Sequence, residues 1–250
     1  VDHHTHLRCE ICSDDVLDTT RDYLGRFDVR LMSLMDHTPG QRQFRDLEKL
    51  RDYYRGKKKG TSEAELDAFF EARRDMHRRN AQPHRRTLVD IAHARGVALA
   101  SHDDTTIEHV AESVADRVSV AEFPTTVEAA RASHAAGLAV LMGAPNVVRG
   151  GSHSGNVSAV ELAEAGVLDI LSSDYVPVSL IEGAFGLAEV AGMGGLPGAV
   201  RTVTKNPAEA TGFSDRGEIA LGKRGDIVRV SLFEGHPVVR EVFRLGRRVA

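Results

Sequence analysis

Short apolar runs recur along the chain, and polar residues able to take part in chemistry follow each of them. Runs of this length, rich in Val, Ile and Leu, are typical of strands that are buried on both faces of a parallel sheet. Six such runs can be distinguished, at residues 1–7, 29–35, 97–100, 118–121, 139–142 and 167–171. The sequence therefore predicts six buried strands whose ends carry reactive side chains.

Helical patterns fill most of the intervals between these runs. Glycine adopts the positive φ at a helix C-terminus without strain, and a glycine closes three of the predicted helices. The alternation of strand and helix predicts a parallel α/β fold. The predicted helices cover residues 14–26, 83–95, 106–115, 126–136 and 159–165, and the closing glycines are Gly96, Gly137 and Gly166.

Reactive residues at the end of every strand favour a (β/α)8 barrel, in which active-site residues lie at the C-terminal ends of the strands. An open doubly wound sheet is the competing architecture, but it would not place chemistry after each strand. Six strands fall short of the eight in a complete barrel. The prediction is therefore a TIM-like barrel that is incomplete, or one with two strands that the pattern does not reveal.

Two segments depart from the barrel rhythm. Residues 41–86 are charged and largely helical, with a helix start near 61–65, and we interpret them as an insertion within a barrel domain at 1–204. Most of its charge suits a solvated surface, although Arg42 is predicted to contact a polyanionic substrate. Residues 205–250 contain short strands and turns, which predict the last barrel helix and part of a small β domain.

Composition excludes several classes of partner. The net charge of −4 argues against nucleic acid, and no apolar run is long enough to span a membrane. No signal peptide is visible. Cys9 and Cys12 form one CxxC without the second half that a four-ligand zinc site needs, so we expect reduced thiols and a cytoplasmic location.

The strand ends together offer many nitrogen and oxygen donors. Zn, Mn and Fe sites use such donors. A divalent metal lowers the pKa of a bound water to about 7, and a nearby Asp can accept the proton of that water. The sequence thus predicts a divalent metal site formed from among His4, His6, Glu10, Asp36, His37, His102, Asp103, Asp104, Glu122 and Asp174.

The glycine-rich stretch at 143–156 predicts a phosphate-binding loop. Its glycines allow backbone N–H groups to approach a ligand closely, and its side chains add further donors for phosphate oxygens. It is not a Walker loop, because GxxxxGK[ST] is absent. The predicted substrate ligands in this stretch are Arg149, Ser152, His153, Ser154 and Asn156.

The first strand can be placed in the barrel in two ways. If it is strand one, His4 and His6 form the His-x-His pair of metal ligands that amidohydrolases carry there. If Asp174 is instead the aspartate of strand eight, counting backwards makes the first run strand three. We favour the second register, because the spacing before Asp174 leaves no room for two more strands.

Nearly the whole chain resembles the PhnM family, the amidohydrolase-type diphosphatases of the carbon–phosphorus lyase pathway. The long stretches LMSLMDHTPGQRQF and VLMGAPNVVRGGSHSGN carry most of the resemblance. Shorter matches are HLRCE, ALASHDD, AEFPTT, LDILSSDY, TKNPAEA and DRGEIALGKRGDIV. The resemblance implies a (β/α)8 barrel with a small β-sandwich and a divalent metal. It also implies hydrolysis of α-D-ribose 1-methylphosphonate 5-triphosphate to the 5-phosphate and pyrophosphate.

The resemblance also implies roles for particular residues. His102 corresponds to the metal ligand of strand five, and Asp174 to the ligand or base of strand eight. Glu122 stands where relatives often carry a His, and Asp36 or His37 stands where many use a carboxylated Lys. The identity and number of metal ions therefore stay open.

Members of this family begin with a β segment and a first strand carrying His-Thr-Asp, and neither is found in these residues. The six runs then correspond to strands three to eight. We expect this chain, taken alone, to hold metal poorly and to have little activity.

Two other functions remain open. A cyclic amide hydrolase resembling dihydroorotase would suit the register with His4 and His6 as ligands, and a non-catalytic subunit of the pathway's enzyme complex would need no metal. Homo-oligomer formation is left undecided.

Overall fold

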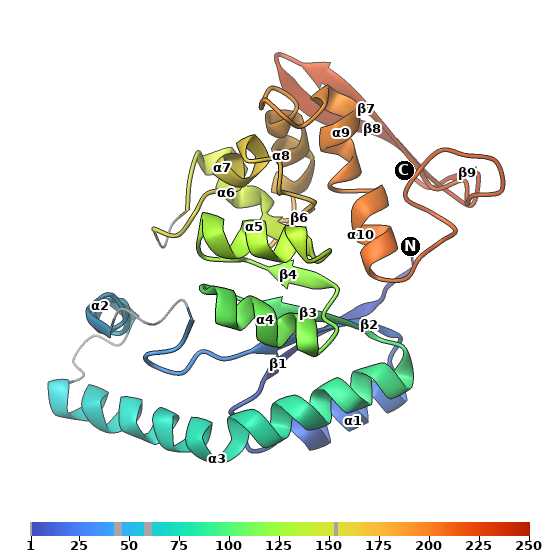
Figure 1. The fold of residues 1–250 in the computed structure, drawn as a ribbon. Helices are drawn as coiled ribbons and strands as arrows, with labels where there is room; N and C mark the ends of the chain where they lie inside the picture. The colour runs from blue at the N-terminus through green and yellow to red at the C-terminus, as the bar shows by residue number, and fades with distance from the viewer. Residues whose placement is uncertain (1, 43–46, 58–61, 153–154) are drawn as a thin grey trace.

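The computed structural model describes residues 2–42, 47–57, 62–152 and 155–250. Its centre is a six-stranded sheet whose strands lie side by side in chain order, each parallel to its neighbours (Figure 1). A doubly wound sheet would reverse its strand order at a switch point, and no reversal occurs here. The strands are β1 Thr5–Glu10, β2 Val29–Met35, β3 Ala98–His102, β4 Val120–Glu122, β5 Ala139–Gly143 and β6 Ile170–Ser172.

The sheet has a separate layer of apolar side chains on each face. The larger core lies between the strands and the helices and includes Met32, Leu34 and Leu162. On the other face, β2 to β6 each contribute one buried residue to a second, smaller cluster. This arrangement resembles the side-chain layers inside a (β/α)8 barrel. The second cluster consists of Leu31, Ala100, Val120, Leu141 and Ile170.

Helices connect successive strands, as the alternating pattern predicts. The side chains of Thr106, Thr126 and Ser158 accept hydrogen bonds from backbone N–H groups in the first turns of α4, α5 and α7. These caps fix where each helix leaves its strand. The helices that follow β1, β3, β4, β5 and β6 are α1 Val16–Arg26, α4 Ile107–Ala115, α5 Val127–Ala135, the pair α6 Ala144–Arg149 and α7 Ala159–Glu164, and α8 Ser179–Leu187.

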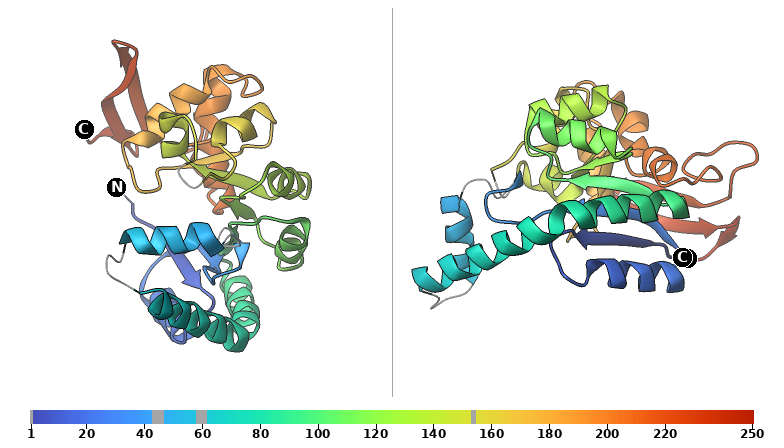
Figure 2. Two further views of the ribbon diagram at one scale, coloured as in Figure 1. Left: turned by 90° about the vertical axis from the view of Figure 1, so that its left-hand side faces the viewer. Right: turned by 60° about the horizontal axis from the view of Figure 1, so that its bottom comes forward.

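The second part of the inserted segment and the following barrel helix form one continuous helix rather than two. Helix α3 spans Glu63–Arg95 and begins at a capping box between Ser62 and Glu65, in agreement with the predicted start. It passes through Pro83, which the sequence pattern places at a helix start. Proline costs about 3 kcal/mol inside a helix, but buried residues on both sides of it, including Ala81 and Leu88, keep the helix packed against the protein. Figure 2 shows one half of α3 along the sheet and the other half extending past it.

The C-terminal region contains short helices and a second sheet. The antiparallel strands β7 Ile227–Phe233, β8 His236–Arg244 and β9 Arg247–Arg248 pair in chain order. The remaining helices in the described part of the chain are α2 Leu47–Lys57, α9 Gly195–Arg201 and α10 Lys205–Ala210. Among the described residues, no helix combines the length and the apolar character needed to cross a membrane.

Replacing Leu34 by Ala should lower the free energy of unfolding by about 2–5 kcal/mol, because the truncation leaves a cavity in the larger core. Leu34 is completely buried, whereas Leu221 is fully exposed. Leu221→Ala is therefore the matched control and should change the free energy by no more than about 0.5 kcal/mol. Chemical denaturation would measure both changes, and equal stabilities of the two variants would contradict this placement of Leu34.

Candidate metal centre and active site

A cavity of about 270 Å³ opens at the C-terminal ends of the strands. Because all six strands are parallel, residues that follow them in the sequence meet at this one edge. Six of the residues that the sequence predicts for the site line the cavity. They are His37, His102, Arg149, Ser152, Asn156 and Asp174, and the strand-end donor Asp103 is a seventh.

His102, the last residue of β3, is held by a carboxylate on the neighbouring strand. Its Nδ1 lies 2.8 Å from Oε2 of Glu122, the last residue of β4. A carboxylate accepts hydrogen bonds but does not donate them, so Nδ1 carries the hydrogen and Nε2 of the neutral ring keeps its lone pair. Both side chains are buried. Glu122 therefore fixes the ring orientation and the tautomer of His102.

His37 is held in the same way by a carboxylate from β1. Glu10, the last residue of β1, lies 2.7 Å from His37 Nδ1 through Oε2 and accepts from the His37 backbone N–H through Oε1 at 3.1 Å. Burial alone would lower the pKa of His37, but the hydrogen bond and the charges of Glu10 and Asp103 outweigh it and raise that pKa. The two imidazoles thus have matching support from neighbouring strands.

The two Nε2 atoms meet at the carboxylate of Asp103. Asp103 Oδ2 lies 3.4 Å from His102 Nε2 and 3.8 Å from His37 Nε2. Burial raises the pKa of Asp103, and within the described part of the chain its Oδ2 accepts no hydrogen bond although it is buried. A buried carboxylate oxygen without a donor is costly unless a cation or proton compensates it.

These donors suit a divalent cation. One ligand atom each from His37, His102 and Asp103 lies within 4.8 Å of the other two. Two imidazole nitrogens and one carboxylate oxygen are donors that Zn, Mn and Fe accept. The carboxylates behind both rings match the support that metal-binding histidines receive in other proteins. A cation would also compensate the Asp103 oxygen, so the residues fit a metal.

Asp174 lies on the rim of the same cavity, beside the end of β5. A side chain at Gly143 would place its Cβ 3.3 Å from Asp174 Oδ2, so the absence of a side chain there leaves room for this carboxylate. Asp174 and His102 therefore border one cavity, although Asp174 does not belong to the group formed by His37, His102 and Asp103.

Three residues beyond the strand ends have left-handed backbone conformations. Asp103, Phe123 and Asp174 have φ values of 57°, 56° and 47°. Such values are uncommon outside glycine and cost about 1–3 kcal/mol each when the residue is strained, and they cluster at functional sites. All three line the cavity. The backbone here turns in a way that directs side chains into the cavity.

The predicted phosphate loop forms another part of the cavity wall. The Arg149 guanidinium, at the end of α6, donates a hydrogen bond of 3.2 Å to the hydroxyl of Tyr175. Gly150 follows with a φ of 76°, which ends the helix and turns the chain toward Ser152 and Asn156. His153 and Ser154, which the sequence also predicts as substrate ligands, lie outside the described residues.

The other predicted site residues that the structure describes, apart from Asp103, do not line this cavity. Glu122 lies behind His102 and also accepts a hydrogen bond of 2.8 Å from Ser33. Burial acts to raise its pKa, but the hydrogen bond from His102 and the nearby positive charges bring the pKa of Glu122 to about 2. Arg42 is buried and forms an ion pair with Asp104, so the structure gives it a local partner within the protein.

Asp36 and His37 are adjacent in sequence but point to different places. His37 faces the cavity, whereas Asp36 accepts a hydrogen bond from the Thr38 backbone and pairs with His77 of α3 at 3.0 Å. Burial opposes ionisation of Asp36, but the hydrogen bonds from His77 and Thr38 hold its pKa well below the usual range. Of the two alternatives for strand four, His37 therefore contributes to the cavity.

The histidines of the alternative register lie elsewhere. His4 precedes β1 and pairs with Asp28 at 2.7 Å, and His6 forms a hydrogen bond of 2.6 Å with Ser33. His4 and His6 thus lie just before and at the beginning of β1, whereas Glu10 lies at its end. This placement favours the register in which His4 and His6 are not metal ligands.

Three residues with a part in the site were not assigned a role from the sequence. Glu10 and Asp103 are among the strand-end donors, but their roles depend on which neighbour they meet across the sheet. Arg8 lines the cavity and lies 3.4 Å from Glu122. The available signal for Arg8 was its position two residues before Glu10, since side chains at i and i+2 of a strand lie on the same face of the sheet.

The sequence and the fold are similar to those of known proteins. The Escherichia coli (strain K12) α-D-ribose 1-methylphosphonate 5-triphosphate diphosphatase is 50% identical over 249 residues, which cover 99% of this chain and 66% of the relative. The chain thus spans just under two thirds of that protein.

A crystal structure of an uncharacterised protein is similar in fold, with a TM-score of 0.51 and 24% identity over 66% of this chain and 48% of the other. A prolidase complexed with N-methylphosphonate-L-proline gives a TM-score of 0.47 and 25% identity over the same shares. The model of the amidohydrolase family matches residues 80–249, more than half of the chain. The chain therefore belongs to the amidohydrolase family.

Proposed function

We propose that this protein is a diphosphatase that hydrolyses α-D-ribose 1-methylphosphonate 5-triphosphate to the 5-phosphate and pyrophosphate. The observation that carries the proposal is the 50% identity to the diphosphatase of that name over nearly the whole chain. The cavity supports it, because metal-capable donors and an arginine-containing loop border one space.

His37, His102 and Asp103 would hold the divalent metal. When bound, such a cation neutralises charge on phosphoryl oxygens and makes water nucleophilic near neutral pH. Glu10 and Glu122 would keep both Nε2 atoms free and oriented to bind it. Zn, Mn and Fe all suit these donors, so the identity of the metal and the number of ions stay open.

Asp174 would act as the general base. Its carboxylate borders the cavity but is not one of the three metal donors. It would therefore be available to accept a proton from the attacking water. Proton transfer to a positioned carboxylate contributes about 10²–10⁴-fold to rate.

Arg149, Ser152 and Asn156 would bind the polyphosphate. The planar guanidinium suits phosphate oxygens, since it can donate two parallel hydrogen bonds. The leaving pyrophosphate carries most of the charge, so we place it against this loop. In the barrel numbering of the family, β1 to β6 would be strands three to eight, and β7 to β9 part of the β-sandwich.

Asp174→Asn should lower kcat for pyrophosphate release about 10²–10⁴-fold, because an amide cannot accept the proton of water. The assay follows pyrophosphate produced from the triphosphate by the complete gene product. Asp90→Asn, at an exposed position of α3, is the matched control and should leave kcat unchanged. Turnover by Asp174→Asn at the parent rate would disprove the role of Asp174.

Arg149→Ala should raise KM for the triphosphate roughly tenfold, with a smaller effect on kcat, because it removes a charge-assisted hydrogen bond that holds the substrate. Steady-state kinetics of pyrophosphate release would separate the two constants. Arg131→Ala removes an exposed arginine of α5 and serves as the control. Equal KM values for the two variants would count against a substrate-binding loop.

Glu122→Gln should weaken divalent-metal binding about 10–100-fold, since the amide no longer fixes the tautomer of His102. Competition between the protein and a chelating dye would measure the affinity independently of turnover. Glu128→Gln, at an exposed site in the first turn of α5, provides the comparison. Unchanged affinity in Glu122→Gln would mean that His102 does not bind the ion.

A further inference from the structure

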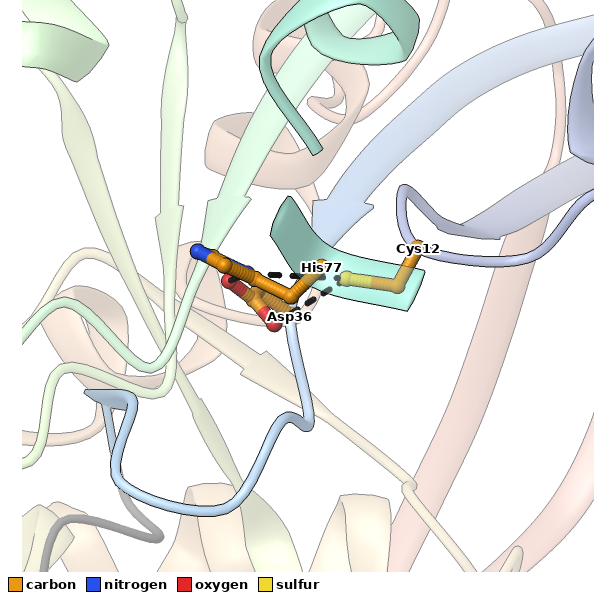
Figure 3. Close-up of side chains that lie close together, drawn as sticks. All are labelled: Cys12, Asp36 and His77. Atoms are coloured by element: carbon orange, nitrogen blue, oxygen red, sulfur yellow. Dashed lines mark hydrogen bonds and ion pairs between the residues drawn. The ribbon is translucent and has the colours of Figure 1, made fainter. Parts of the chain in front are cut away.

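A second group of potential metal ligands lies outside the cavity. It consists of Cys12, Asp36 and His77, and one ligand atom from each lies within 4.8 Å of the other two. Cys12 follows β1, Asp36 follows β2, and His77 lies on α3. Figure 3 shows the three side chains converging from these three segments.

The distances within the group approach those of a tetrahedral metal site, with Asp36 facing Cys12 through Oδ1 and His77 through Oδ2. Cys12 Sγ lies 3.4 Å from Asp36 Oδ1 and 3.7 Å from His77 Nδ1, and His77 Nδ1 lies 3.0 Å from Asp36 Oδ2. With metal–sulfur bonds of ~2.3 Å and metal–nitrogen or metal–oxygen bonds of ~2.0–2.1 Å, tetrahedral ligands lie roughly 3.3–3.6 Å apart. Small side-chain shifts would complete this geometry.

Hydrogen bonds alone do not account for all the polar neighbours of the Cys12 sulfur. Thr38 Oγ1 also lies 3.3 Å from Cys12 Sγ, so the sulfur has three polar neighbours, although a thiol has one hydrogen to donate. Sulfur is also a weak acceptor. A cation would bind the sulfur, the nitrogen and the carboxylate oxygen at once.

The surroundings allow an ion to enter and to keep a fourth ligand. Cys12 and Asp36 are buried, whereas 29% of the His77 side chain is exposed. Asp36 and His77 line a cavity of about 320 Å³, which offers room for water as a fourth ligand. Three protein ligands with one open position are common for zinc.

We propose that Cys12, Asp36 and His77 form a second metal site, separate from the cavity of His37 and His102, and that it binds zinc. On binding, the thiol of Cys12 and Nδ1 of His77, which carries the hydrogen of its bond to Asp36, each release a proton to solvent. The thiolate and the Nδ1 lone pair then bond to the ion, and Nε2 of His77 carries the remaining ring hydrogen. The soft sulfur favours zinc over magnesium or manganese. The ion would connect β1, β2 and α3 beside His37.

A spectroscopic signal from a metal–thiolate bond would distinguish this site from the active site, because no cysteine lines the described cavity of His37 and His102. Cobalt commonly substitutes for zinc, and a thiolate ligand gives it a charge-transfer absorption band in the near ultraviolet. We would titrate the metal-depleted complete gene product with Co²⁺. We expect this band to appear, to saturate at one equivalent of thiolate-bound ion, and to disappear when Zn²⁺ is added.

Matched variants assign the band to this group. Cys12→Ser should abolish it, and His77→Ala should weaken cobalt binding at least tenfold. Cys9→Ser should retain the full band, because Cys9 contacts Thr20 instead. His84→Gln, which changes another histidine of α3, should also retain it. Far-ultraviolet circular dichroism would establish that each variant is folded.

A measurement on the unmodified protein keeps the proposal testable if a variant does not fold. X-ray absorption of the zinc-loaded protein should show a sulfur neighbour at about 2.3 Å. The proposal is overturned by nitrogen and oxygen neighbours alone, by the absence of a cobalt–thiolate band, or by a band that survives in Cys12→Ser. None of these readouts depends on pyrophosphate release, so failure here leaves the proposed function untouched.

Discussion

The pairing of a buried or half-buried carboxylate with an imidazole across neighbouring strands is the interaction on which the site depends. Glu10 holds His37, and Glu122 holds His102, each through Nδ1. Ionised carboxylates are stable in such a buried place only when hydrogen bonds compensate their charge. Because each pair joins two adjacent parallel strands, the register of the sheet decides whether both Nε2 atoms reach Asp103.

The pairing of the strands and the geometry of the site therefore depend on the same strand register. A slip of one residue in β1 against β2 would turn Glu10 to the other face and leave His37 without its partner. The ladder of β1 and β2 pairs Glu10 with Met35, two residues before His37. The short distance along the chain from strand end to ligand leaves little freedom for the imidazole.

The sequence predicts much of this architecture from physical regularities. Apolar runs locate all six strands, and parallel packing explains why His37, His102 and Asp174 border one cavity. The direction of Asp36 cannot be predicted in this way, because adjacent residues after a strand diverge and the pattern does not say which faces inward. The continuity of α3 through Pro83 could not be predicted either. The low helix propensity of proline opposes a continuous helix, whereas packing against the rest of the protein stabilises it. The domain boundary at 204 stays a prediction.

The single helix from Glu63 to Arg95 also limits how this part of the chain can change in length. Each residue added to or removed from an α-helix rotates everything beyond it by about 100°. A deletion between His77 and the packed residue Leu88 would therefore turn the imidazole away from Asp36, even if every other residue were kept. Insertions or deletions of about a whole number of helical turns would keep the His77 imidazole directed toward Asp36. Changes in length before His77 would not alter its direction.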